Sequence, residues 1–305
     1  MLDLCLLGTG GMMPLPYRYL TSLYARLNGS ALVIDCGEGT QMALRKSGFS
    51  PYPIDVICFT HYHGDHISGL PGLLLTMGNA DRTEPLTLIG PKGLERVVSM
   101  LRVVAPELPF ALEFVEFTGD SFEYAFKDYK IRAFKVDHRV PCYGYTLTVD
   151  RLPEFDPEKA KAAGIPLRAW NRLQHGETVE ADGEVYTPDM VMGPPRKGLK
   201  VTYVTDTRPI DRIAAEAEGA DLFIAEGMYG EAEKDDALRE KKHMLMQDAC
   251  RLAKEAGAKE LWLTHFSPAV NHPKEYEEEL KELFPAVLVP KDGQCTTLRF
   301  EEAQS

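Results

Sequence analysis

The sequence lacks any long apolar run and any recognisable export signal. No stretch approaches the ~20 apolar residues that a membrane-spanning helix requires, which excludes a membrane span. Residues 1–8 carry neither a basic region nor a cleavage site, so we interpret them as a first β-strand and not as a signal peptide. With 44% hydrophobic and 26% charged residues, the chain is expected to be soluble and globular and to have no membrane partner.

The six cysteines include no Cys-x-x-Cys pair. Several lie within apolar runs, where cysteine behaves as a small hydrophobic residue. This pattern fits reduced thiols in the cytoplasm better than it fits a disulfide framework. We therefore expect a cytoplasmic protein.

Positive charge is scarce, because the 34 Lys and Arg residues are outnumbered by 46 Asp and Glu residues, which gives a formal net charge of −12. This balance argues against indiscriminate nucleic-acid binding, because phosphate binding needs a local concentration of cations. One acid-free segment, residues 159–175, has such a concentration together with an aromatic residue: Lys159, Lys161, Arg168, Trp170 and Arg172. The composition is typical of an RNA-contacting element. A solvated helix face at residues 157–163 followed by a loop is the alternative.

Strand-like runs alternate with helical patterns along most of the 305 residues. Strands are expected at residues 31–34, 54–59, 86–89, 129–136, 199–204, 222–225 and 261–264, and helices from about residue 41, at 94–104, and from near residue 243. The alternation predicts an α/β protein. Residues 150–195 break the pattern, because they are rich in proline, glycine and charge, and we interpret them as an insertion.

The most informative feature is a cluster of metal-binding side chains directly after the expected strand at residues 54–59. His61, His63, Asp65 and His66 fall within six residues. Residues two apart in an extended segment point to the same side, so His61 and His63 can bind one cation. Gly64 permits a sharp turn, after which Asp65 and His66 can reach a second cation. A structural histidine pair is the alternative, but four such ligands together indicate a two-metal site that activates water and binds a phosphodiester.

Three further candidate ligands lie within two residues of the ends of expected strands: His138, Asp206 and His265. In α/β sheets, functional groups gather at the carboxyl ends of strands. A dinuclear site needs three to four protein ligands per metal, which the combined set supplies. Histidine and carboxylate ligands suit zinc, although Mn²⁺ or Fe²⁺ can occupy similar sets.

This ligand set resembles that of the metallo-β-lactamase superfamily and, within it, the ribonuclease Z family of tRNA 3′-processing endonucleases. Further similar segments lie at residues 7–11, 35–41, 69–74, 90–94, 175–179, 194–198 and 206–208. The resemblance implies an αββα four-layer sandwich, in which two packed mixed β-sheets carry outer helices. It also implies a single domain over residues 1–305, with residues 150–195 as an inserted arm that contacts RNA.

The resemblance implies two Zn²⁺ per chain, held by seven side chains. One zinc would take His61, His63 and His138, the other would take Asp65, His66 and His265, and Asp206 would bridge them.

Three residues would carry the chemistry. Asp65 would orient or deprotonate the attacking water, while Glu226 and His243 would form a relay that protonates the departing 3′-oxygen. The alternatives are a strand-end carboxylate with satisfied hydrogen bonds for Glu226 and a helix N-terminal side chain for His243.

The expected function is that of a zinc-dependent endoribonuclease that removes 3′ trailers from precursor tRNA by metal-activated water attack on a phosphodiester. One alternative is a related metallo-phosphodiesterase acting on a small or cyclic nucleotide or on another RNA. A second is a non-catalytic scaffold that keeps a structural metal. The resemblance also implies a homodimer, in which the arm of one subunit serves the site of the other.

Overall fold

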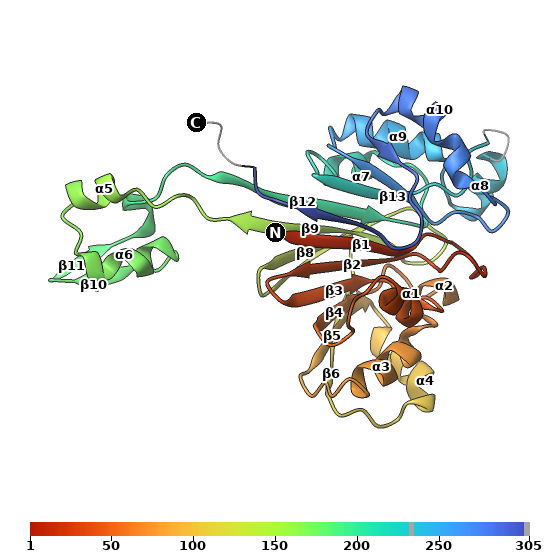
Figure 1. Ribbon diagram of the computed structural model, residues 1–305, viewed down its shortest axis with the longest axis horizontal. Helices are drawn as coiled ribbons and strands as arrows, with labels where there is room; N and C mark the ends of the chain where they lie inside the picture. The colour runs from red at the N-terminus through yellow and green to blue at the C-terminus, as the bar shows by residue number, and fades with distance from the viewer. Residues whose placement is uncertain (232–234, 302–305) are drawn as a thin grey trace. The chain divides into compact units, whose positions relative to one another are not determined.

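The computed structural model describes residues 1–231 and 235–301 (Figure 1). The chain divides into two compact units. The larger unit comprises Met1–Thr148 and Lys200–Arg299, and the smaller comprises Val149–Leu199 with the C-terminal residues from Phe300. In the described part of the chain, no helix has the length and apolarity needed to cross a membrane.

The first sheet of the larger unit has seven strands in the order β16-β1-β2-β3-β4-β5-β6. They are β1 (Leu2–Gly8), β2 (Ser22–Leu27), β3 (Ser30–Ile34), β4 (Ile54–Cys58), β5 (Leu86–Pro91), β6 (Leu112–Phe117) and β16 (Gln294–Leu298). The pairs from β16 to β3 are antiparallel and those from β3 to β6 are parallel. Parallel neighbours need crossover connections. The helices α1 (Thr40–Lys46), α2 (Gly64–Ile67), α3 (Leu70–Gly78) and α4 (Leu94–Leu101) lie in these connections.

The second sheet also has seven strands, in the order β15-β14-β13-β12-β9-β8-β7. They are β7 (Ser121–Phe126), β8 (Tyr129–Lys135), β9 (Tyr143–Arg151), β12 (Arg196–Val204), β13 (Leu222–Glu226), β14 (Leu261–Thr264) and β15 (Val287–Leu288). Strands β12 to β15 pair in parallel, and β7 to β9 pair antiparallel. Its helices are α7 (Asp211–Glu216), α8 (Asp235–Lys241), α9 (Met246–Glu255) and α10 (Glu277–Leu283).

The two sheets of the larger unit pack against each other, with helices on the outside (Figure 1). Buried side chains bond across the interface: the Tyr129 hydroxyl donates to the Ser30 carbonyl at 3.0 Å, and the Tyr145 hydroxyl donates to the Phe59 carbonyl at 2.7 Å. Each sheet has a separate apolar core with its own helices, α1, α3 and α4 on the first, α7, α9 and α10 on the second. The predicted sandwich of two mixed sheets with outer helices is confirmed.

The smaller unit has a hydrophobic core of its own. It contains α5 (Pro157–Ala162), α6 (Leu167–Gln174) and the two-stranded ribbon of β10 (Val179–Ala181) and β11 (Glu184–Tyr186). Apolar side chains from all four elements form one buried cluster: Ala160, Ile165, Ala169, Leu173, Val179, Ala181, Tyr186 and Val191. Asp156 caps α5 by accepting hydrogen bonds from the backbone of Glu158 and Lys159, which is why that helix begins at Pro157.

The expected strands form close to their predicted bounds, but two helices differ. The helix expected at residues 94–104 ends as an α-helix at Leu101 and continues as a 3₁₀ turn, Arg102–Val104. Helix α9 begins at Met246 and not near residue 243, because Leu245 is extended and its N–H donates to the Asp248 carboxylate at 3.0 Å. Residues 243–245 are therefore outside the helix.

Candidate metal centre

The seven candidate metal ligands lie together at the carboxyl ends of strands from both sheets. They follow four strands: His61, His63, Asp65 and His66 follow β4, His138 follows β8, Asp206 follows β12, and His265 follows β14. Parallel strands place their carboxyl ends on one edge of a sheet, which is why ligands distant in sequence meet here.

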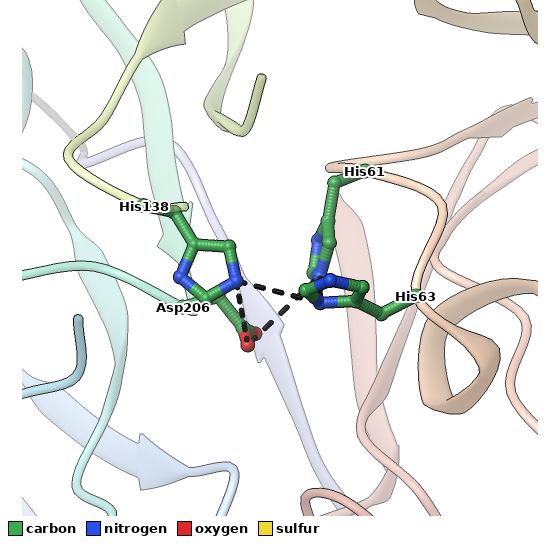
Figure 2. Close-up of side chains that lie close together, drawn as sticks. All are labelled: His61, His63, His138 and Asp206. Atoms are coloured by element: carbon green, nitrogen blue, oxygen red, sulfur yellow. Dashed lines mark hydrogen bonds and ion pairs between the residues drawn. The ribbon is translucent and has the colours of Figure 1, made fainter. Parts of the chain in front are cut away.

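The first ligand group consists of three imidazoles and one carboxylate that converge from separate segments (Figure 2). His61 Nε2 lies 2.8 Å from His63 Nδ1, and His63 Nδ1 lies 3.4 Å from His138 Nε2. Asp206 Oδ1 lies 3.9 Å from His138 Nε2 and 4.0 Å from His61 Nε2. The four ligand atoms can therefore surround one cation.

The second group consists of Asp65, His66 and His265. Its two Nε2 atoms lie close to the other oxygen of Asp206, at 3.0 Å for His66 and 3.2 Å for His265. Each also lies 3.5 Å from Asp65 Oδ2. Asp206 thus presents one oxygen to each group, as a bridging ligand would.

Several buried polar atoms at the metal centre form no hydrogen bond of acceptable geometry with the described residues, although they lie 3.0–3.5 Å from neighbouring ligand atoms. They are His66 Nε2, Asp206 Oδ2 and both ring nitrogens of His265. Buried polar atoms in folded proteins are nearly always paired, and a metal ligand is one of the few exceptions. Imidazole nitrogens and carboxylate oxygens suit divalent cations, so the residues present fit a metal centre.

The carboxylates give this centre an excess of negative charge that attracts cations. Burial lowers the pKa of His265, but Asp206, Asp65 and Glu226 outweigh burial and raise that pKa to about 10. Burial lowers the pKa of His61 well below its ordinary value, which keeps this ring neutral and its lone pair available. His61 is therefore a neutral nitrogen ligand, whereas the carboxylates favour positive charge at His265, which a bound cation would supply in place of the proton.

A buried carboxylate behind the ligands fixes the orientation of His66. Asp35, which follows β3, accepts a hydrogen bond from the Thr60 N–H at 2.8 Å, and its Oδ2 lies 2.8 Å from His66 Nδ1. A carboxylate at Nδ1 holds the proton there and directs the Nε2 lone pair toward the centre. The Thr60 hydroxyl lies 3.0 Å from His61 Nδ1 and supports that ring similarly.

Three residues of the site adopt left-handed backbone conformations. The φ angles are 62° for Asp35, 53° for Asp206 and 59° for His265. Such angles are uncommon outside glycine and persist where the surroundings enforce them, often at functional sites. Gly11 packs closely on the same ligand, since a Cβ atom there would lie 2.7 Å from the His265 ring.

Glu226 and His243 form a hydrogen-bonded pair beside the ligands. Glu226 ends β13, its Oε2 lies 2.9 Å from His243 Nδ1, and its Oε1 accepts the Thr207 N–H at 2.6 Å. Burial raises the pKa of Glu226, but the charge and hydrogen bond of His243 outweigh it and lower that pKa overall. An ionised Glu226 holds the proton on Nδ1, which leaves Nε2 of His243 for proton exchange.

An open cavity of about 240 Å³ exposes ligands from both groups and His243. Two cationic side chains that the sequence interpretation missed, Arg139 and Lys241, also line it. Arg139 directly follows His138, and Lys241 precedes His243 by two residues, so proximity to predicted site residues was the available signal. Both can bring positive charge to an anionic substrate.

The candidate RNA-contacting residues lie in the smaller unit. Lys159, Lys161, Arg168 and Arg172 are exposed, but three of them form ion pairs with nearby carboxylates. Arg168 pairs with Asp182, and Arg172 pairs with Glu177 at 2.7 Å. Trp170 is half-buried against Phe155, and its indole N–H donates to the Ile165 carbonyl at 2.9 Å. The cations are accessible, whereas Trp170 packs within its own unit.

The sandwich of two mixed sheets and the histidine–aspartate cluster at its strand ends define a metal-dependent hydrolase of the metallo-β-lactamase superfamily. Residues 190–266 match the family model described as "Beta-lactamase superfamily domain", and residues 2–147 match "Anti-Pycsar protein Apyc1". The chain belongs to the ribonuclease Z family, because it is 60% identical over 302 residues to a ribonuclease Z of Lachnoclostridium phytofermentans, an alignment that covers 99% of each chain. Both the superfamily and the family predictions are confirmed.

Two further similar proteins agree with this placement. A ribonuclease Z of Lachnospira eligens is 58% identical over 302 residues and 99% of each chain. The crystal structure of human tRNase Z, short form, has the same fold, with a TM-score of 0.69 at 24% identity, over 98% of this chain and 100% of that one.

Proposed function

We propose that this chain is an endoribonuclease that removes 3′ trailers from precursor tRNA. The observation that carries the proposal is the pairing of His243 with Glu226 at 2.9 Å, directly beside a complete set of seven metal ligands. A structural metal site would need neither a proton donor nor an open cavity. The names of the relatives, ribonuclease Z and tRNase Z, support RNA as the substrate class.

The centre would hold two divalent cations, for which zinc is our first choice. His61, His63 and His138 would bind one, Asp65, His66 and His265 would bind the other, and Asp206 would bridge them. Bound cations would lower the pKa of a water molecule and neutralise charge on the scissile phosphate. Mn²⁺ and Fe²⁺ suit the same ligands and would be alternatives to zinc.

The chain's own side chains would then position and move protons. Asp65 is held by the Met12 N–H, which donates to its Oδ2 at 2.7 Å, and would orient the attacking water or accept its proton. His243 would deliver a proton to the departing 3′-oxygen, and Glu226 would keep its ring in the required tautomer. Arg139 and Lys241 would attract the phosphodiester.

The inserted arm would contribute to RNA binding in this proposal. Its exposed cations Lys159, Lys161, Arg168 and Arg172 would contact phosphates and exchange their present carboxylate partners for them. Trp170 would hold the helix that carries two of these residues and not stack on a base. A homodimer and a cytoplasmic location complete the proposal, and the six free thiols fit a reducing compartment.

End mapping of the products from a precursor tRNA with a 3′ trailer tests this proposal. The zinc-loaded protein is expected to make one cut directly after the discriminator base and to leave a 3′-hydroxyl. Chelation should abolish the cut, and added zinc should restore it. Hydrolysis of bis-p-nitrophenyl phosphate without any cut in the precursor would contradict the tRNA assignment and point to a small phosphodiester.

A further inference from the structure

A second cavity, of about 670 Å³, lies in the larger unit and shares no lining residue with the cavity at the metal centre. Its wall comes from the segment after β1, the end of α1, the loop after β14 and the loop before β16. Thr9 lines it, and Gly11, two residues further on, packs against the His265 ring. Residues 9–11 therefore link the cavity wall to a metal ligand, and the cavity is large enough for part of a nucleotide chain.

Four cationic side chains and two carboxylates line this cavity. The cations are Arg18, Lys46, Lys274 and Lys291, and the carboxylates are Glu275 and Asp292. Lys274 is paired with Glu277, and the other three cations still outnumber the two carboxylates, in contrast to the net charge of −12 for the whole chain. Lys46 and Lys291 are exposed, and neither forms an ion pair with a carboxylate of residues 1–231 or 235–301. They are available to an anionic ligand.

Arg18 is a buried cation at the same cavity, with only 6% of its surface exposed. Its guanidinium donates to the carbonyls of Ser267, Val270 and Asn271, at 3.3, 2.8 and 3.2 Å. It forms no ion pair with any carboxylate that the structure describes, and burial lowers its pKa. The charge of Asp292 acts on Arg18 but does not outweigh burial, so an anion in the cavity would further stabilise this buried cation.

Asp292, one of the two acids in the cavity wall, already accepts hydrogen bonds. Asp292 accepts the Thr9 hydroxyl at 2.8 Å and the Tyr19 N–H at 2.6 Å, and burial raises its pKa. Its oxygens hold the segment after β1 in place. Asp292 offsets part of the charge of Arg18, whereas Lys46 and Lys291 form no ion pair with a carboxylate of residues 1–231 or 235–301.

An aromatic side chain, Tyr17, also lines this cationic cavity. Tyr17 is 61% exposed, and its hydroxyl donates to Asn271 Oδ1 at 3.2 Å, which fixes the ring. Positive charge beside an exposed aromatic ring is the combination that binds single-stranded or end regions of RNA, through phosphates and base stacking.

We propose that this cavity is a phosphate-binding subsite for the RNA backbone of the substrate, separate from both the metal centre and the arm. Lys46 and Lys291 contact the phosphates, Arg18 supplies buried positive charge, and Tyr17 offers a stacking face. The choice of RNA as the source of the phosphates rests on the proposed function. The presence of an anion-binding cavity does not rest on the proposed function.

Equilibrium binding of processed tRNA, which offers no bond to cleave, tests the subsite at several salt concentrations. The variant Lys46→Ala with Lys291→Ala is expected to bind roughly tenfold more weakly at moderate salt, and its salt slope should fall by about 1.5, because each phosphate contact contributes ~0.7–0.9. Two further variants serve as controls for the double alanine variant. Lys46→Arg with Lys291→Arg keeps the charge, and Lys92→Ala with Lys254→Ala removes two exposed lysines elsewhere.

If only the variant Lys46→Ala with Lys291→Ala binds processed tRNA more weakly, the proposal is supported. If that variant and the variant Lys92→Ala with Lys254→Ala bind it equally well or equally weakly, the proposal is overturned. AMP in a calorimetric titration distinguishes the sources of phosphate. Loss of AMP binding in the cavity variant, with unchanged tRNA binding, would assign the site to a free nucleotide and overturn the RNA assignment. Because binding requires no cleavage, a wild-type protein that binds tRNA but does not cut the precursor would count against the proposed function and not against the subsite.

Discussion

Replacing Asp206 by asparagine will lower phosphodiester hydrolysis by at least about 10³-fold, more than the 10–100-fold typical when a group that merely supports a ligand is lost. The two oxygens of Asp206 face different ligand groups, at 3.0–3.2 Å on one side and 3.9–4.0 Å on the other. Asparagine has nearly the same shape but only one acceptor oxygen and no charge. In the proposed centre, the variant would therefore lose the bridge between two cations and a negative charge that stabilises both.

Hydrolysis of bis-p-nitrophenyl phosphate and metal content per chain are the measurements for this variant. We expect metal content to fall together with the rate, while circular dichroism stays unchanged. Asp128→Asn is the matched control, because Asp128 is a surface carboxylate that accepts a hydrogen bond from Asn28. A variant at position 206 that kept both metals and the wild-type rate would refute the bridging role.

Replacing His243 by alanine will lower kcat for precursor tRNA by roughly 10²–10⁴-fold, the usual contribution of a general acid. The same change should alter hydrolysis of bis-p-nitrophenyl phosphate only a few-fold. The reason is the leaving group: a ribose 3′-oxygen needs a proton as it departs, whereas p-nitrophenolate is stable without one. Metal content should remain at the wild-type level, since His243 is outside the proposed ligand set.

Glu226→Gln separates positioning from proton donation. Glu226 contacts the His243 ring and the Thr207 N–H, and a glutamine keeps its shape but not its charge. We expect a smaller loss on RNA than for His243→Ala, with the pH profile of kcat displaced and the nitrophenyl ester little affected. If both variants slowed both substrates equally, His243 would be acting on the metal centre and not on the leaving group.

The clustering of the candidate metal ligands could be predicted from sequence because its physical basis is local. Four ligands lie within six residues, and the others directly follow apolar runs whose carboxyl ends meet at one sheet edge. The strand β14, Leu261–Thr264, has the predicted bounds for the same reason, since a short, fully buried run leaves little freedom at its ends.

Other features depend on contacts between distant segments and left no local signal. The left-handed backbone of Asp206 and His265 arises from packing around the site, and sequence patterns carry no information on it. The core of the smaller unit was hidden because its apolar residues are spaced among charged ones, from Ala160 to Val191. Trp170 stands within a basic stretch in the sequence, but folding turns its ring toward Phe155.

The late start of α9 has a similar origin. Residues 243–245 fit a helical pattern, yet the His243 ring pairs with Glu226 on β13, and Asp248 binds the N–H of Leu245. These contacts favour an extended entry to the helix over another turn. The residue with the predicted proton-transfer role is thus placed by tertiary contacts that a helix propensity cannot anticipate.

Anomalous diffraction at the zinc edge, from crystals of the zinc-loaded protein, tests whether the centre holds two metal ions. We expect two peaks about 3.5–4 Å apart, the separation of hydrolytic two-metal sites. One should lie among His61, His63 and His138, the other among Asp65, His66 and His265, with Asp206 between them. A single peak, or peaks away from these side chains, would contradict the dinuclear centre on which the proposed chemistry depends.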